Sequence, residues 1–267
     1  MQKSKLLKIL FVGDIIGKLG RQVCRLVLPD LKAELEPDLI IANGENSAHG
    51  YGITEIVYKE LLAMGIEAIT MGNHVWDKKD LAKNINKMPL VVRPANYPPG
   101  VPGQDHLIIE KSGVKIGIIN VSGRTFMPAL DCPFRAAERV TSSLKTNLIL
   151  VDMHAEATSE KCALAWFLNG KVSAVLGTHT HVMTADERIL PQGTAFISDI
   201  GMVGAFESII GMGKEQILKR FLTQMPERFE PMDHGPGLFN AVLLKIDAIS
   251  GQAKEIKRIY KVVESTA

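Results

Sequence analysis

Apolar runs of four to six residues alternate with amphipathic stretches in the first third of the chain. The runs have the length of buried strands, and we expect strands at 8–13, 39–42 and 68–71. Apolar positions at helical spacing lie between them and predict helices at 21–35, 55–64 and 78–86. Pro29 should kink or split the first helix, and Thr54 should cap the second. This alternation indicates parallel strands joined by right-handed crossovers.

Strands follow one another more directly in the second half. We expect them at 107–110, 115–121, 147–153, 174–177, 195–198, 241–246 and 256–262, the first two joined by a hairpin. Helices are expected at 133–144, at 159–168 behind a serine cap, and at 214–222. Because some of these strands have no helix between them, the pattern favours an α/β fold with two mixed sheets packed face to face. With helices outside, this is a four-layer α/β/β/α sandwich.

The connecting segments are compatible with one domain over residues 1–267. Residues 94–102 form a Pro-rich loop, and strands resume directly after it. Residues 201–213 are rich in Gly and Met, and we expect a mobile loop there.

Composition and charge exclude several classes of protein. Hydrophobic residues make up 46% and charged residues 22% of the 267, which is ordinary for a globular fold. The net charge of +2, with dispersed Lys and Arg, argues against a DNA-coating surface. No apolar run approaches the roughly 20 residues of a membrane helix. The three cysteines form no CxxC pair, which is typical of reduced thiols. We therefore expect a cytoplasmic protein without membrane or DNA partners.

Polar residues that can bind metals follow five of the expected strands. In chain order they are Asp14, Glu45, Asn46, Asn73, His154, His179 and His181. Because the carboxyl ends of parallel strands meet at one edge of a sheet, these side chains should converge. A lone histidine or aspartate there would more often be structural, but five strand ends with suitable ligands predict a site for two metal ions.

We assign the ligands to the two ions from their positions. Glu45 lies in a turn and can bridge both ions, whose mutual repulsion requires a bridging anion. The first ion is then held by Asp14, Asn46 and His181, and the second by Asn73, His154 and His179. A regular strand would direct the two histidines of His-x-His to one face, whereas an irregular backbone would let His181 reach the first ion. Mixed oxygen and nitrogen ligands suit iron, manganese and zinc better than magnesium or calcium.

The motifs resemble those of the calcineurin-like metallophosphoesterases, in the order GD, GEN, GNH, a middle His and GTHTH. The first motif of that family is Asp-x-His, and here Ile16 stands in place of the histidine. The second motif is an aspartate, and here it is Glu45, followed by Asn46 as a replacement for the missing histidine. Longer stretches, such as NGENSAHGYGIT and GTHTHVMTADERILP, are similar to the YmdB-like subfamily over residues 8–260.

This resemblance implies a fold, a centre and a reaction. The fold is the four-layer sandwich, and the centre holds two iron ions (Fe-Fe), with manganese or zinc left open. The reaction is hydrolysis of 2′,3′-cyclic nucleotides to 3′-nucleotides by in-line attack of a metal-activated hydroxide. His74, beside the ligand Asn73, is then the candidate general acid for the leaving oxygen.

Several alternatives stay open at this stage. The chain could be another phosphoester hydrolase, such as a nucleotidase or phosphomonoesterase, or a regulatory RNA-associated protein on the same fold. Arg124 could bind a phosphate or form a surface salt bridge, and His49 could line the mouth of the site or be merely exposed. Asp77 could orient His74, although helix capping is the simpler interpretation. Glu156 and Glu160 could support His154. The subunit count is also open, a homo-oligomer included.

Overall fold

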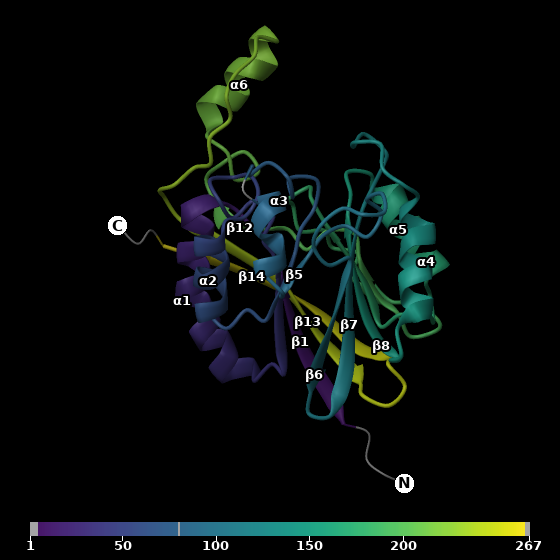
Figure 1. Cartoon of the computed structure of the whole chain (residues 1–267). Helices are drawn as coiled ribbons and strands as arrows, with labels where there is room; N and C mark the ends of the chain where they lie inside the picture. The colour runs from purple at the N-terminus through teal and green to yellow at the C-terminus, as the bar shows by residue number, and fades with distance from the viewer. Residues whose placement is uncertain (1–4, 80, 265–267) are drawn as a thin grey trace.

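Two β-sheets pack face to face with helices on their outer surfaces in the computed structural model, which describes residues 5–79 and 81–264 (Figure 1). The strands of the first sheet lie in the order β2 (Asp14–Ile15), β12 (Met202–Ala205), β13 (Gly237–Asp247), β1 (Leu6–Val12), β3 (Leu39–Asn43), β4 (Ala68–Thr70) and β5 (Val91–Val92), with β14 (Ala253–Val263) paired to β13. Those of the second lie in the order β10 (Arg188–Ile189), β11 (Ala195–Ile197), β9 (Ala174–Thr178), β8 (Leu148–His154), β7 (Val114–Ser122) and β6 (His106–Lys111).

Each sheet has a parallel centre, as the alternation of elements predicts. Strands β1, β3, β4 and β5 are parallel to one another, and so are β7, β8, β9 and β11. Antiparallel strands flank both centres; β13 lies beside β1 in one sheet and β6 beside β7 in the other. The carboxyl ends of the central strands therefore lie along one edge of each sheet, which is where a ligand site is expected.

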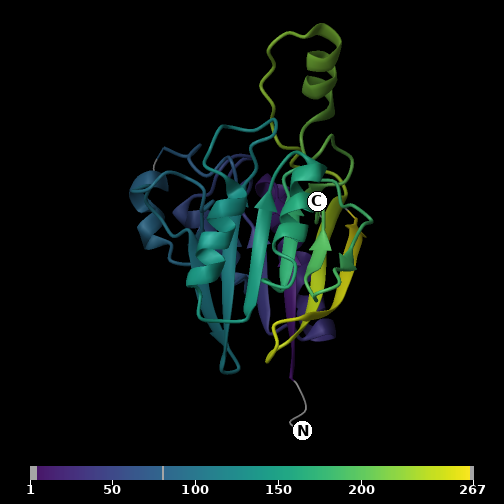
Figure 2. The same ribbon diagram turned by 90° about the vertical axis from the view of Figure 1, so that its right-hand side faces the viewer.

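The helices are α1 (Gly17–Leu35), α2 (Glu55–Ala63), α3 (Leu81–Asn84), α4 (Pro133–Ser143), α5 (Thr158–Phe167) and α6 (Lys214–Thr223), with a short 3₁₀ turn η1 (Ile85–Lys87). In Figure 1, α1 and α2 lie outside the first sheet, while α4 and α5 cover the second. Figures 1 and 2 both show α6 and the segment after it standing away from the rest of the molecule. No helix among the described residues is long and apolar enough to cross a membrane.

The two sheets divide the hydrophobic core into three layers, one between the sheets and one between each sheet and its outer helices. Alternate residues of β1 point in opposite directions, since side chains alternate along a strand. Ile9 packs between the sheets against residues such as Ile118, and Leu10 faces the helices of the first sheet. On the far side, Val151 and Leu164 join the second sheet to its helices. The predicted four-layer sandwich is confirmed.

Two local predictions are wrong, and a third is wrong in part. Helix α1 is kinked or split at Pro29 according to the prediction, but it is not split, because the proline lies on the exposed face, where solvent can satisfy the carbonyl left unpaired. Ser159 does not cap α5; Ala157 is the N-cap and makes no side-chain cap bond. The supposed mobile loop at 201–213 contains β12, which is buried between β2 and β13. Residues with little strand propensity pair here because the sheet supplies partners on both sides.

Candidate metal centre

The predicted ligands do lie along one edge, at the carboxyl ends of strands from both sheets. Glu45 and Asn46 follow β3, and Asn73 follows β4. From the second sheet, His154 is the last residue of β8, and His179 follows β9 directly. Two sheets therefore face each other across the site. The first sheet presents mainly oxygen atoms that can bind a metal, and the second presents imidazoles.

The first group has four side chains, three of which converge on the Nε2 atom of the fourth, His154. A carboxylate oxygen, Oε1 of Glu45, lies 3.0 Å from it. An amide oxygen, Oδ1 of Asn73, also lies at 3.0 Å, and Nδ1 of His179 lies at 3.1 Å. Even without Asn73, the residues Glu45, His154 and His179 form a group whose ligand atoms lie within 4.8 Å of one another. These are the side chains expected to hold the second ion.

The hydrogen bonds behind His154 indicate that this cluster is built for a cation. The Thr178 hydroxyl lies 2.7 Å from Oδ1 of Asp152 and 2.9 Å from Nδ1 of His154. Because the hydroxyl donates to the carboxylate, it accepts the hydrogen of Nδ1, so the neutral ring, the form that binds a metal, has its lone pair on Nε2. That lone pair then faces a carboxylate oxygen and an amide oxygen, both of which are acceptors. A metal ion resolves this arrangement, so the residues fit the implied group.

The pKa shifts in the cluster arise from burial and from the charges of neighbouring members. Burial lowers the pKa of His154, but the Glu45 carboxylate outweighs it and raises the value to about 9. Burial likewise raises the pKa of Glu45, and His154 outweighs it and lowers the value to about 2. For His179, burial and the neighbouring His154 both lower the pKa, to about 3. With no ion bound, the Glu45 carboxylate thus favours a proton on Nε2 of His154, in the place that a metal ion would occupy.

The second group of side chains meets the first at Oε1 of Glu45. Nδ2 of Asn46 is 3.1 Å from Oε1 of Glu45 and 3.2 Å from Nε2 of His181. Nε2 of His181 is in turn 3.8 Å from Oδ1 of Asp14. That carboxylate oxygen is buried and has no hydrogen-bond partner among the described residues. An orphaned carboxylate oxygen is what a bound cation would satisfy. The Asn46 amide would have to turn over to present its oxygen.

The backbone carrying the two histidines is irregular. His179 has φ of 100° and His181 has φ of 67°, both unusual for residues other than glycine. The strand ends at Thr178, so the irregular alternative of the His-x-His prediction applies. Asp199 holds the strained turn, because its Oδ2 accepts from the backbone N of Thr180 at 3.0 Å and from its hydroxyl at 2.7 Å.

The sequence interpretation missed Asp199 and its partner Lys161. The Nζ of Lys161 lies 2.7 Å from Oδ2 of Asp199, and both side chains are almost fully buried. Asp199 comes shortly after a strand, in SDIG, and this is the signal by which the other candidates were found. It lies one layer behind the ligands and positions the turn.

His74 lies beside the cluster and is held from three sides. Its backbone N donates to Oε2 of Glu45 at 3.0 Å, and its ring Nδ1 lies 2.7 Å from Oδ2 of Asp77. The ring of Tyr51 meets it edge to face, with centroids 5.0 Å apart. The Asp77 carboxylate is thus in a position to orient the ring of His74. Helix α3 is described from Leu81 onward, so a capping role for Asp77 stays a prediction.

The remaining candidates lie around the rim. Arg124 is exposed, and its backbone N donates to Oε1 of Glu160 at 3.2 Å, so Glu160 anchors this loop rather than His154. No ion pair involves Arg124 in the described part of the chain. Glu156 does not contact His154 either; its Oε2 lies 3.2 Å from Nε2 of His179. His49 is exposed, with φ of 56°, and lines a hollow next to the site.

A four-layer sandwich with carboxylates, amides and imidazoles along one sheet edge defines the chain as a hydrolase of the metallophosphoesterase class. The family described as YmdB-like protein matches residues 10–259, and the chain belongs to this family. The predicted family, fold and class are therefore confirmed.

Its relatives include one curated enzyme and two solved structures of similar length. The chain is 47% identical, over 95% of its own length and 96% of the relative, to the 2′,3′-cyclic-nucleotide 2′-phosphodiesterase of Bacillus subtilis (strain 168). A hypothetical protein from Thermus thermophilus superimposes with a TM-score of 0.91 at 42% identity, covering 96% of this chain and 100% of that one. A structure described as a novel phosphatase, from Mycoplasma pneumoniae, gives a TM-score of 0.92 at 37% identity, covering 98% and 95%.

Proposed function

We propose that the chain is a metal-dependent phosphodiesterase that hydrolyses 2′,3′-cyclic nucleotides to 3′-nucleotides. The observation that carries the proposal is the convergence of acceptor atoms on Nε2 of His154, next to a histidine held by a carboxylate. The name of the Bacillus subtilis relative, at 47% identity, supports this substrate class.

The two ions would be held by the two groups of side chains that meet at Glu45. Asn73, His154 and His179 would hold one, and Asp14, Asn46 and His181 the other. A bound pair of such ions supplies an acidified water and neutralises charge on the phosphoryl oxygens. Iron is our proposal for the metal on the family resemblance, with manganese and zinc as alternatives that the donor set also accepts.

His74 would deliver the proton that the leaving oxygen needs. The Asp77 carboxylate accepts from Nδ1–H of the ring and so directs Nε2 away from itself. Protonated at Nε2, the ring is a general acid. The 2′ oxygen would take that proton as its bond to phosphorus breaks. The contact with Tyr51 limits rotation of the ring. With the 2′ oxygen placed near His74, the 2′ bond breaks and the 3′ ester is retained.

The competing activity is a phosphomonoesterase, because the Mycoplasma pneumoniae structure at 37% identity is described as a phosphatase. Assays of protein loaded with iron, manganese or zinc on 2′,3′-cyclic AMP and on 3′- and 5′-AMP separate the two. We expect 3′-AMP from the cyclic ester, resolved from 2′-AMP by chromatography. Mainly 2′-AMP would reverse the proposed orientation. Hydrolysis of the monoesters without the cyclic diester would replace the function.

A further inference from the structure

A hollow of about 740 Å³ borders the metal centre, between the loop after β3 and the segment after α6. Its size lies in the range of pockets that enclose a ligand larger than a phosphate group. Its lining residues come from the start of α1, the loop after β3, the end of α6 and the segment after that helix. We call it the Tyr51 pocket, and the side chains that matter here are Lys18, His49, Tyr51, Lys78, Arg220 and Phe229.

The Tyr51 pocket is continuous with the reaction site. Tyr51 lines the pocket, and its ring is in edge contact with His74, with centroids 5.0 Å apart. His74 in turn donates its backbone N–H to Glu45. The far wall packs tightly on the same loop, since a Cβ on Gly50 would lie 2.6 Å from Pro231. A ligand whose reacting group lies near His74 can therefore extend past Tyr51 into this hollow.

The charges of the pocket favour an anion. Its carboxylates each lie at ion-pairing distance from a basic side chain: Glu227 from Lys219 at 2.5 Å, Glu230 from Arg228 at 3.6 Å, and Asp233 from His234 at 3.0 Å. In contrast, Lys18, Lys78 and Arg220 take part in none of the ion pairs between described residues. These three cations remain available to a negatively charged ligand.

Aromatic rings accompany these cations. The guanidinium of Arg220 lies over the ring of Phe229, with its Cζ 5.2 Å from the centroid. Tyr51 presents a second ring at the side nearest the metal centre. Cations along a groove with aromatic rings between them are the usual means of binding single-stranded nucleic acid, because phosphates pair with the cations and bases stack on the rings.

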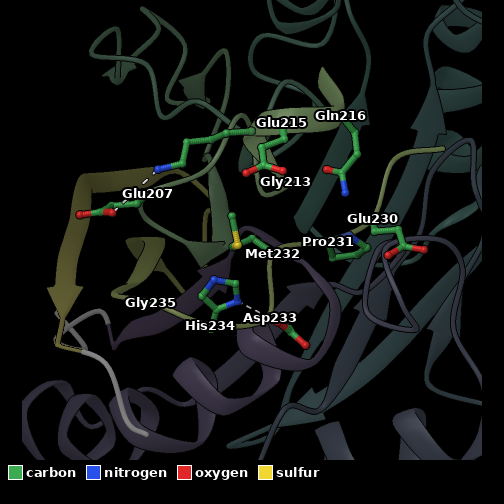
Figure 3. Close-up of a pocket in the computed structure, with 11 residues that line it drawn as sticks. Glu207, Gly213, Glu215, Gln216, Glu230, Pro231, Met232, Asp233, His234 and Gly235 are labelled. Carbon is green, nitrogen blue, oxygen red and sulfur yellow. Dashed lines mark hydrogen bonds and ion pairs between the residues drawn. The ribbon is translucent and has the colours of Figure 1, made fainter. Parts of the chain in front are cut away.

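A neighbouring pocket provides an internal comparison. Its lining residues are drawn in Figure 3, and it shares Glu230, Pro231 and Asp233 with the Tyr51 pocket. Its volume is about 470 Å³. Its carboxylates include Glu207 and Glu215, and Lys214 lies 3.9 Å from the first of them. This pocket is acidic and would repel a phosphodiester chain. The Tyr51 pocket therefore differs in charge from the neighbour with which it shares part of its wall.

We propose that the Tyr51 pocket binds the nucleotide on the 5′ side of a terminal 2′,3′-cyclic phosphate, so that the preferred substrates are oligoribonucleotides with this ending. The inference rests on the proposed function and specifies its substrate class. When the 2′ oxygen lies near His74, the 5′ carbon of the same ribose carries the rest of the chain. Its phosphodiester would contact Lys78 or Arg220, and the preceding base would stack on Tyr51 or Phe229.

The test compares a mononucleotide with a dinucleotide on the same metal-loaded protein. We expect kcat/KM for the dinucleotide ApA 2′,3′-cyclic phosphate to exceed that for 2′,3′-cyclic AMP by at least about tenfold, as expected for one stacked base and one paired phosphate. The preference should shrink with rising salt. Arg220→Gln and Lys78→Gln should each reduce the ratio several-fold, whereas Lys79→Gln, one residue away and outside the pocket, should preserve it.

Each other outcome has a definite meaning. Equal kcat/KM for the two substrates would overturn the subsite while leaving the cyclic phosphodiesterase intact. An equal loss on both substrates in Arg220→Gln and Lys78→Gln would also overturn it, because the pocket would then serve the single nucleotide. Failure to hydrolyse either cyclic substrate, with turnover of a monoester, would show that the proposed function itself is wrong.

Discussion

The metal cluster and the proton-donor side of the site are in direct contact, yet they are built differently. The side chains of His154, Glu45 and Asp14 are at most 1% exposed, and buried donors such as Thr178 fix their orientation. The side chains of His74 and Asp77 are 28% and 45% exposed, and they contact each other. Losing one member of a buried cluster should have a large effect, because it leaves neighbouring charged or polar groups without that partner and away from water. The exposed side can be altered with graded effects.

The largest effect should come from removing the negative charge that both groups of ligands share. Glu45→Gln loses the carboxylate that lies near His154, Asn46 and the backbone of His74. We expect loss of bound metal and a fall in kcat of roughly 10³-fold or more. Elemental analysis should give two metals per wild-type chain. At most one equivalent after iron or manganese loading would contradict the two-metal centre.

A steric variant tests the crowding of the cluster without changing a ligand. A Cβ built on Gly72 would lie 2.3 Å from Oε2 of Glu45 and 2.3 Å from Nε2 of His154. Gly72→Ala should therefore displace both ligands and reduce metal content and kcat by roughly 10²-fold or more, because misplaced ligands lose their geometry. Full metal content in a folded Gly72→Ala protein would show that the cluster is looser than described.

On the exposed side, His74→Ala should keep the metals and lose roughly 10²-fold in kcat, the usual contribution of a general acid. The loss should be smaller for p-nitrophenyl esters, because their leaving group needs little protonation. His106→Ala is a matched control, since His106 contacts Asp105 in the same way but lies on the edge strand β6. An equal loss for good and poor leaving groups would remove His74 from this role.

The same contrast explains what the sequence could reveal. Glu45, His154 and His179 each follow an apolar run, so their position at a sheet edge could be predicted from period and length alone. The metal roles of these residues stay predictions, but the structure brings all seven side chains together. The fold was likewise predictable as far as its layers, because strand and helix periods are local signals.

The parts that escaped prediction depend on contacts between distant segments. The positive φ of His181 needs the neighbouring Thr180 to be held by Asp199, and β12 forms only because β2 and β13 lie beside it. The Tyr51 pocket needs Pro231 to pack on Gly50. No short window of sequence contains both members of such a pair, so neither propensity nor periodicity can indicate them.

Thr178→Val tests the buried side more gently. Valine keeps the shape of threonine but removes the hydroxyl between Asp152 and His154. The Nδ1–H of His154 then loses its acceptor, and the ring can turn or change tautomer. We expect metal affinity to fall by about 10- to 100-fold, as for other residues that orient a metal-binding histidine. Restoration of kcat by excess metal would support this; a permanent loss with metal bound would point to a direct role in the reaction.

Asp77→Asn should have the smallest effect, because it acts only through His74. An asparagine can still accept from Nδ1 of His74 through its amide oxygen, but this hydrogen bond is weaker than one to an ionised carboxylate. We expect kcat on 2′,3′-cyclic AMP to fall about tenfold with little change in metal content, the lower end for residues that support a catalytic group. The fall should shrink for p-nitrophenyl esters as it does for His74→Ala, and Asp77→Glu should recover part of the rate. Combined with His74→Ala, the change should cost almost nothing further, since its only partner in the reaction is gone. A tenfold loss that persists in the double variant would mean that Asp77 contributes independently, and the exposed side of the site would then contain a second reacting group.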